Sequence, residues 1–124
     1  MTGGDPTLRK VEDLEALCRE IKRLGMRSCL MTNGIRASRA FLTRLAAAGL
    51  DDVAFHVDMT QERKGFTSEV ELNTVRRAYI RRARGLGLRI LFNTTVFEGN
   101  FDDLPILARF LRDRPEVAFV SFQM

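Results

Sequence analysis

The chain has 124 residues, of which 45% are hydrophobic and 29% charged, and its formal net charge is +4 at pH 7. This length suits one domain with its own apolar core over residues 1–124 and is too short for two. Because the sequence holds no run of about 18 apolar residues and no apolar signal-peptide segment at its start, we expect a cytoplasmic protein without a membrane span.

The first feature along the chain is a predicted turn, Gly3-Gly4-Asp5-Pro6, which stands where a strand would lead into a helix. Two adjacent glycines allow the backbone to approach a small polar ligand closely. The carboxylate of Asp5 offers an acceptor for a bound cation or amine, and Pro6 restricts the direction in which the chain leaves. The turn therefore indicates a contact site.

The next segments form a strand, a turn and two helices. Apolar residues recur every three or four positions from Val11 to Leu24 and predict an amphipathic helix that ends at Gly25. A short apolar run at 29–31 predicts a strand. Ser38 is placed to cap a second helix, which ends at Gly49.

The same unit then returns. We predict strands at 53–57, 89–96 and 117–122 and helices at 69–86 and 104–111. The strands are nearly continuous apolar runs, which is typical of a parallel sheet covered by helices. An α/β fold follows, built as an incomplete parallel βα barrel. The long connection 59–68 is either a functional loop or a plain surface connection.

Arginine supplies 17 of the 20 basic residues, and these arginines are scattered over several predicted helices. We therefore do not expect nucleic acid as a partner. The densest group shares the helix 69–86 with an apolar stripe, so we interpret it as a solvated outer face, with a phosphate-binding patch as the alternative. This group comprises Arg76, Arg77, Arg81, Arg82 and Arg84.

The two cysteines, Cys18 and Cys29, are eleven positions apart, which matches no zinc or disulfide spacing. Cys18 lies on the apolar face of a predicted helix and Cys29 lies in a predicted strand. We therefore expect both to be core residues. Since His56 is the one histidine of the chain, we predict no metal site.

Three predicted strands end in polar residues two positions apart, and such residues share a face of a strand. The pairs are His56 with Asp58, Asn93 with Thr95, and Ser121 with Gln123. Because helices cover the outer face, we expect the pairs to face inward at the carboxyl ends of the strands, where βα barrels and doubly wound sheets bind ligands.

Two further residues, Asp5 and Asn33, occupy corresponding positions at the ends of their own strands. Taken singly, Asn33 also fits a simple turn residue, and His56 fits a hydrogen-bonded interior histidine. Together these polar residues favour one shared site.

The order and spacing of these segments resemble the radical SAM enzyme core over essentially the whole chain. The segments that carry the resemblance are 2–8, Thr32-Asn33-Gly34, 48–53, His56-Val57-Asp58, 93–96 and Gly99-Asn100. The resemblance implies a partial six-unit βα barrel in which a [4Fe-4S] cluster reductively cleaves S-adenosylmethionine to give a 5′-deoxyadenosyl radical.

The resemblance also implies cofactor-binding roles. Gly3, Gly4 and Asp5 would receive the amino group of the methionine moiety, and Asp5 stands where the family more often has glutamate. His56 and Asp58 match positions that contact the ribose or carboxylate side, where the family commonly has serine and aspartate. The remaining predicted cofactor-binding residues are Pro6, Asn33 and Asn93, with Asn93 near the ribose.

The family holds its cluster with a Cys-x3-Cys-x2-Cys loop, which this chain lacks. We therefore expect strands two to six of the core, with the cluster ligands and the chemistry in a parent enzyme and a missing N-terminal barrel segment as partner. We expect the chain alone to assemble no cluster and to self-associate through its open sheet edge.

Two alternatives stay open at this point. The first is a non-catalytic module that binds S-adenosylmethionine or an anion. The second is an unrelated βα-barrel enzyme that uses His56 and Asp58 as an acid–base pair. The substrate and the oligomeric state are not predicted.

Overall fold

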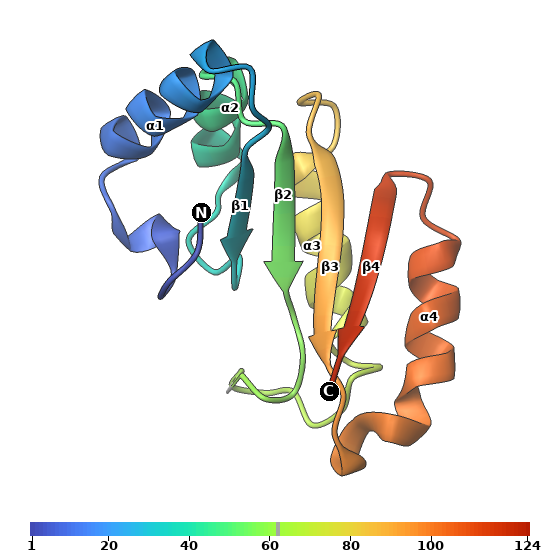
Figure 1. The fold of residues 1–124 in the computed structure, drawn as a ribbon. Coiled ribbons are helices and arrows are strands. Elements are labelled where there is room, and N and C mark those ends of the chain that lie inside the picture. Colours follow the sequence, from blue (N-terminus) through green and yellow to red (C-terminus); the bar gives the residue numbers. More distant parts are fainter. Residues whose placement is uncertain (62) are drawn as a thin grey trace.

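A computed structural model describes residues 1–61 and 63–124. Four strands form one parallel sheet in chain order, and in Figure 1 all four arrows point the same way. The strands are β1 (Cys29–Thr32), β2 (Asp52–His56), β3 (Arg89–Thr95) and β4 (Val117–Gln123). The helices are α1 (Val11–Arg23), α2 (Arg39–Ala47), α3 (Asn73–Ala83) and α4 (Leu104–Arg112), with short 3-10 segments η1 (Pro6–Leu8) and η2 (Glu98–Asp103).

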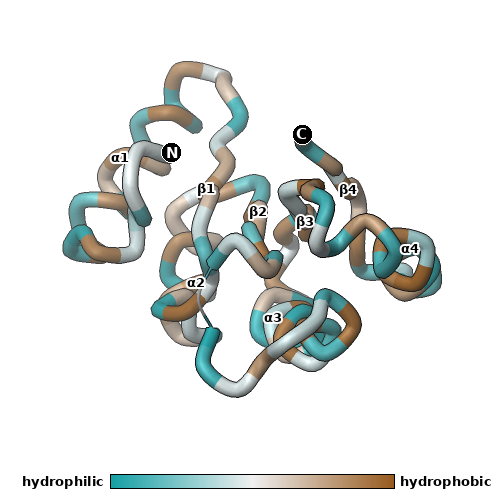
Figure 2. Tube along the Cα trace, turned by 90° about the horizontal axis from the view of Figure 1, so that it is seen from below, coloured by the Kyte–Doolittle hydropathy of each residue, from teal (hydrophilic) through white to brown (hydrophobic). Residues whose placement is uncertain are grey.

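This arrangement confirms the predicted α/β fold and agrees with a partial βα barrel. Seen along the strands, the sheet curves, with the helices on its outer side and its inner side open (Figure 2). All helices lie on one side because each connection between neighbouring parallel strands turns in the same right-handed sense. In residues 1–61 and 63–124, no helix is both long and apolar enough to cross a membrane.

The core lies between the sheet and the helices. Phe55 of β2 packs against Phe92 of β3 and Tyr79 of α3, with ring centroids 5.7 and 4.9 Å apart. In β2 and β3, alternate apolar residues are almost fully buried there, namely Val53, Phe55, Ile90 and Phe92. The intervening residues therefore face the open side of the sheet.

The starts of two helices follow their local sequence. The hydroxyl of Ser38 accepts a hydrogen bond from the backbone N–H of Phe41 at 3.1 Å, which caps α2 as predicted. Helix α1 carries two acidic residues in its first turn and buries Leu14 and Cys18 against the core. The core position of Cys18 is thus confirmed.

The prediction that Cys29 is a core residue was wrong, because Cys29 is only half-buried. It lies on β1 one position before the buried Leu30, so its side chain points to the open face instead of the helical layer.

The predicted helix 69–86 is shorter than expected and turns a different face inward. It begins at Asn73 and ends at Ala83. Arg76, predicted to lie on a solvated face, is fully buried, whereas Arg77 is exposed. Arg76 follows Leu72 by four positions and precedes Tyr79 by three, so helical spacing places all three on the face that packs on the sheet.

The N-terminus runs beside β1. The amino group of Met1 donates to the carbonyl of Cys29 at 2.7 Å, and the carbonyl of Met1 accepts from the N–H of Met31 at 3.0 Å. These two bonds form a parallel bridge. The turn at 3–6 consequently follows in the direction in which β1 ends.

Candidate functional site

Polar side chains form a row across the open face of the sheet. The register pairs His56 of β2 with Asn93 of β3, and Asn93 with Ser121 of β4. Asn33 follows Thr32, the last residue of β1, which pairs with the residue before His56. The row lies near the carboxyl ends of the strands, so the structure brings these residues together.

A pocket of about 270 Å³ opens at this row. Five of the eight residues proposed for cofactor binding line it, together with two glutamines from the loop after β2 and from β4. These residues are Gly4, Asp5, Asn33, His56, Asn93, Gln61 and Gln123. The lining is rich in amide groups, which can both donate and accept hydrogen bonds.

Three predicted residues do not line this pocket. Gly3 and Pro6 line a separate hollow beside the N-terminal segment and α1. Asp58 is fully buried behind His56. Asp58 can therefore affect a ligand only indirectly, through the residues to which it is hydrogen-bonded.

Asp5 joins the N-terminal turn to the end of β1. Its carboxylate accepts from the N–H of Thr7 at 3.0 Å, the hydroxyls of Thr7 and Thr32 at 2.7 and 2.9 Å, and the N–H of Asn33 at 2.9 Å. Burial raises the pKa of Asp5, but these hydrogen bonds outweigh it and the pKa is lowered. Asp5 thus brings a negative charge to the pocket and anchors the turn.

Replacing Asp5 by alanine is expected to lower the free energy of unfolding by about 1–3 kcal/mol, because the buried part of the turn loses its acceptor. Urea denaturation measures this loss. Asp102→Ala, at an exposed site, is the control and should change stability by less than about 0.5 kcal/mol. Equal effects of the two changes would contradict an anchoring role.

Asn33 has a structural task besides facing the pocket. Its side-chain oxygen accepts from the N–H of Ile35 at 2.9 Å, the pattern of a turn residue. Its backbone carbonyl accepts from Arg63 at 2.8 Å. Asn33 is therefore a turn residue that also lines the pocket.

His56 and Asp58 form a hydrogen-bonded pair at the end of β2. His56 Nε2 lies 2.6 Å from Asp58 Oδ2, which also accepts from the N–H of Thr95 at 2.6 Å. The other oxygen, Oδ1, accepts from the N–H and hydroxyl of Thr60 at 3.0 and 2.5 Å. Four donors thus converge on one buried carboxylate.

The charge of Asp58 orients the imidazole. Burial raises the pKa of Asp58, but hydrogen bonds from Thr60 and Thr95 and the charge of His56 outweigh it, so the pKa lies below its ordinary value of 3.8. An ionised carboxylate accepts a hydrogen from Nε2, so when the ring is neutral its hydrogen lies on Nε2. No described residue forms a hydrogen bond with Nδ1, so that nitrogen can serve a ligand.

Stability is expected to fall in acid because of Asp58. The lowered folded-state pKa stabilises the fold above the ordinary value of 3.8, and this contribution is lost as pH falls through the folded-state pKa. Urea denaturation between about pH 2 and 6 should show a flatter acid decline in Asp58→Asn than in the unsubstituted chain. Asp102→Asn is the control, and a decline as steep in Asp58→Asn would refute the assignment.

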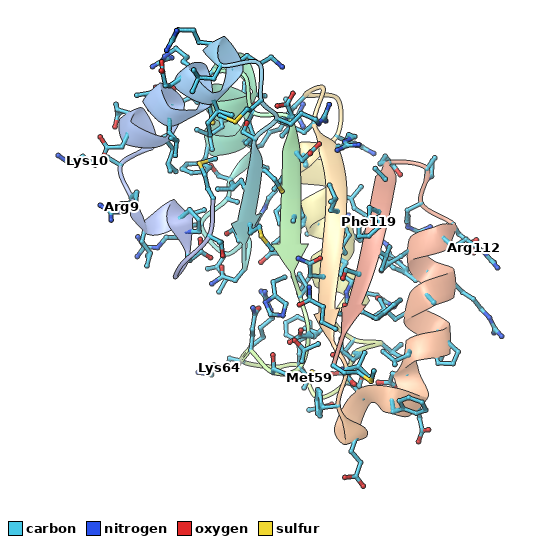
Figure 3. The ribbon with its side chains drawn as sticks, viewed as in Figure 1. Arg9, Lys10, Met59, Lys64, Arg112 and Phe119 are labelled. Carbon is cyan, nitrogen blue, oxygen red and sulfur yellow. The ribbon has the colours of Figure 1, made fainter. Side chains whose placement is uncertain are left out.

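The loop after β2 contributes residues that were not singled out from the sequence. Figure 3 shows Met59 and Lys64 of this loop below the end of β2. Gln61 lines the pocket, and Arg63 donates to the hydroxyl of Tyr79 at 2.9 Å and to the carbonyl of Asn33. Residue 62 of the connection 59–68, predicted to be either a functional loop or a plain surface connection, lies outside the described residues. In the sequence, only the length of this loop indicated that it could contribute to a site.

The residues present do not fit an iron–sulfur cluster. Within the described part of the chain, no three His, Cys, Asp or Glu side chains gather to hold a metal ion. The two cysteines lie on different elements, and burial raises the pKa of both thiols. The cluster that the resemblance implies needs three thiolates, and this chain has two cysteines.

Comparison with known proteins gives a family match over most of the chain. Residues 1–111 match the family described as the Radical SAM superfamily. The PqqA peptide cyclase of Methylobacterium nodulans is 32% identical over 111 residues, which are 86% of this chain and 28% of that protein.

Related proteins from two Xanthomonas species carry the same name. The PqqA peptide cyclase of Xanthomonas campestris is 30% identical over 106 residues, which are 84% of this chain and 28% of that protein. The one from Xanthomonas euvesicatoria is 28% identical over 127 residues, which are 98% of this chain and 34% of that protein. The chain thus spans about a third or less of the length of these relatives.

Proposed function

This chain belongs to the radical SAM superfamily, and from that premise we propose that it is the S-adenosylmethionine-binding part of a radical SAM enzyme core. One observation carries the proposal: side chains from consecutive parallel strands and from the N-terminal turn line one polar pocket. The volume of about 270 Å³ lies just below the range of about 300–1,000 Å³ common for small-molecule sites. It suits part of a nucleoside-sized ligand.

We assign the contacts by chemistry. The backbone at Gly4 and the charge of Asp5 suit the cofactor's amino group, since that group is a cation. Asn93 suits hydroxyl groups, because an amide both donates and accepts, and His56 Nδ1 accepts from a hydroxyl when the ring is neutral. In this superfamily the bound cofactor supplies, after reduction, a radical that abstracts hydrogen from the substrate.

The cluster ligands, in this proposal, come from a part of a longer protein outside these 124 residues. The chain has two cysteines, one fewer than the thiolates that the cluster needs. The chain's share of its relatives' length supports this assignment. We expect no cluster signal in the absorbance or EPR spectrum of the chain after treatment with iron and sulfide, and stoichiometric cluster assembly would contradict it.

Family membership removes the alternative of an unrelated βα-barrel enzyme. A non-catalytic binding module remains as the second candidate, favoured by a polar pocket in a chain that has only two of the three cysteines that the cluster needs. Binding without cleavage by the longer protein would support this module. Release of 5′-deoxyadenosine by the longer protein would support the enzyme.

Calorimetric titration of the chain with S-adenosylmethionine tests the pocket. His56→Ala and Asn93→Ala are each expected to weaken binding about tenfold, which corresponds to the loss of one good hydrogen bond. Thr74→Ala, on the exposed side of α3, is the control and should leave the affinity unchanged. Absence of binding, or affinities that both pocket variants leave unchanged, would overturn the assignment.

For the longer protein we propose a peptide as the substrate class, because the relatives are named for a cyclase that acts on the peptide PqqA. The measurement is 5′-deoxyadenosine release by that protein with and without candidate peptides. Release that no peptide stimulates would argue against this class.

A further inference from the structure

A buried ion pair lies behind the pocket, and neither of its residues is among the proposed cofactor contacts. Glu69 and Arg76 are both fully buried, and Arg76 Nη2 contacts Glu69 Oε2 at 2.5 Å. Nη1 of the same guanidinium donates to the carbonyl of Glu69 at 2.8 Å and to Asn73 Oδ1 at 3.0 Å. Burying two charges costs solvation energy that an apolar pair would not, so a local task is expected of them.

Both members of the pair form hydrogen bonds with the backbone next to Asp58. Arg76 Nη2 donates to the carbonyl of Val57 at 2.6 Å, and Glu69 Oε1 accepts from the N–H of Met59 at 2.8 Å. Val57 and Met59 are the two neighbours of Asp58 in the chain, and Met59 is seen at the end of β2 in Figure 3. The pair therefore holds the peptide groups on both sides of that carboxylate.

The same cluster reaches β3, whose end supplies another donor to Asp58. Asn100 Nδ2 donates to Glu69 Oε1 at 2.9 Å and to the carbonyl of Thr95 at 2.8 Å. The N–H of Thr95 in turn donates to Asp58 Oδ2. The ends of β2 and β3 are thus held in one arrangement around Asp58.

We propose that Glu69 and Arg76 are positioning residues for His56. They hold the backbone on both sides of Asp58, so that its carboxylate keeps the imidazole hydrogen-bonded at Nε2 while Nδ1 is left for a ligand. A guanidinium suits this task because it presents several donors in a fixed plane. The inference rests on the proposed function only in taking this pocket as the ligand site, and its test needs no cofactor.

The test follows the imidazole N–H of His56 by NMR, and the signal is unique because the chain has one histidine. In the unsubstituted chain the Nε2–H, bonded to a buried carboxylate, should give a downfield signal that exchanges slowly with water. Glu69→Gln combined with Arg76→Met removes both charges, which leaves neither one unpaired in the core. We expect this exchange to become at least about tenfold faster, because local opening at Asp58 becomes easier.

Arg77→Gln changes the exposed neighbour on α3 and should leave the exchange rate as it is. A folded double variant, judged by its dispersed methyl signals, with an unchanged His56 exchange rate would overturn the proposal. If the double variant does not fold, Asn73→Ala, which removes one acceptor from Arg76, serves the same test. Faster exchange in this variant supports the proposal, and unchanged exchange in the folded protein overturns it.

A double-mutant cycle connects the pair to binding. If Glu69 and Arg76 act through His56, the double variant should weaken S-adenosylmethionine binding in the unsubstituted chain and have no added effect in a His56→Ala background. Equal losses in both backgrounds would overturn action through His56. Failure of the cofactor to bind at all would count against the proposed function alone, because the exchange experiment stands without it.

Discussion

Arg76→Met alone is expected to lower the free energy of unfolding by about 3–5 kcal/mol, as for other buried pairs that lose one partner. The substitution leaves the fully buried Glu69 carboxylate without its cation and the carbonyl of Val57 without its strong donor. Burial lowers the pKa of Arg76, while the hydrogen bond and charge of Glu69 oppose that shift. Urea denaturation followed by circular dichroism measures the loss.

Two comparisons separate this effect from a general loss of arginine. Arg77→Met changes the exposed neighbour, whose guanidinium carbon lies 5.5 Å from the ring centroid of Phe110, and should cost less than about 1 kcal/mol. Glu69→Gln with Arg76→Met should be less destabilising than Arg76→Met alone, because no unpaired charge remains. A double variant at least as unstable as the single one would contradict this reasoning.

Gly34→Ala is expected to cost about 2–4 kcal/mol of stability, the sum of a backbone term near 1 kcal/mol and an overpacking term of 1–3 kcal/mol. Gly34 has a φ of +79°, which disfavours any residue with a Cβ atom. An added Cβ would also overlap the ring of Tyr79, which packs against Phe55 and accepts a hydrogen bond from Arg63. Thermal or urea unfolding gives the value.

Gly87→Ala is the matched control for this substitution. Its φ of +76° is nearly the same, but a Cβ added there would meet no described atom within 4 Å. It should therefore show the backbone term alone, and the difference between the two variants measures the contact with Tyr79. Equal losses at the two positions would mean that the ring moves aside without cost.

The disturbance at Gly34 should also reach the pocket. Asn33, its neighbour, lines the pocket and accepts from Arg63 through its carbonyl. Weaker S-adenosylmethionine binding is thus expected in Gly34→Ala, while Gly87→Ala retains the affinity. This comparison uses the same titration as the pocket variants.

Much of the fold could be predicted from the sequence alone, because the spacing at which apolar residues recur is a local property of the chain. The spacing of apolar residues from Val11 onward indicates α1, and the hydroxyl of Ser38 indicates the start of α2. Alternation along a strand separates Phe55 from His56 and so predicts which residues face the open side. The parallel order then follows from short, right-handed connections.

The burial of Arg76 shows where such reasoning stops. A charged residue on the apolar face of a helix is unusual, and two of the partners of Arg76 come from outside the helix: Glu69 from the loop and Val57 from the end of β2. Nothing local indicates that these groups meet. The predicted face of the arginine-rich helix was wrong at this residue for that reason.

The turn at Asp5 shows the same limit for the site. Its composition indicates a contact with a ligand, but the folded chain brings Thr32 and Asn33 to the carboxylate across 27 and 28 positions. These hydrogen bonds occupy much of the acceptor capacity of the Asp5 carboxylate and hold the turn in place. The position of the carboxylate in the pocket therefore depends on residues that are distant in the sequence.

Local order along the chain thus specifies which segments become strands and helices and which side chains share a face, because these depend on backbone geometry over a few residues. The depth of each polar group, its hydrogen-bonding partners and hence its charge arise when distant segments pack together. His56 illustrates both parts: its strand position is evident from alternation, whereas its orientation comes from Asp58, Thr95 and the buried pair behind them. Packing governs the second part because desolvation and hydrogen bonding act between neighbours in space.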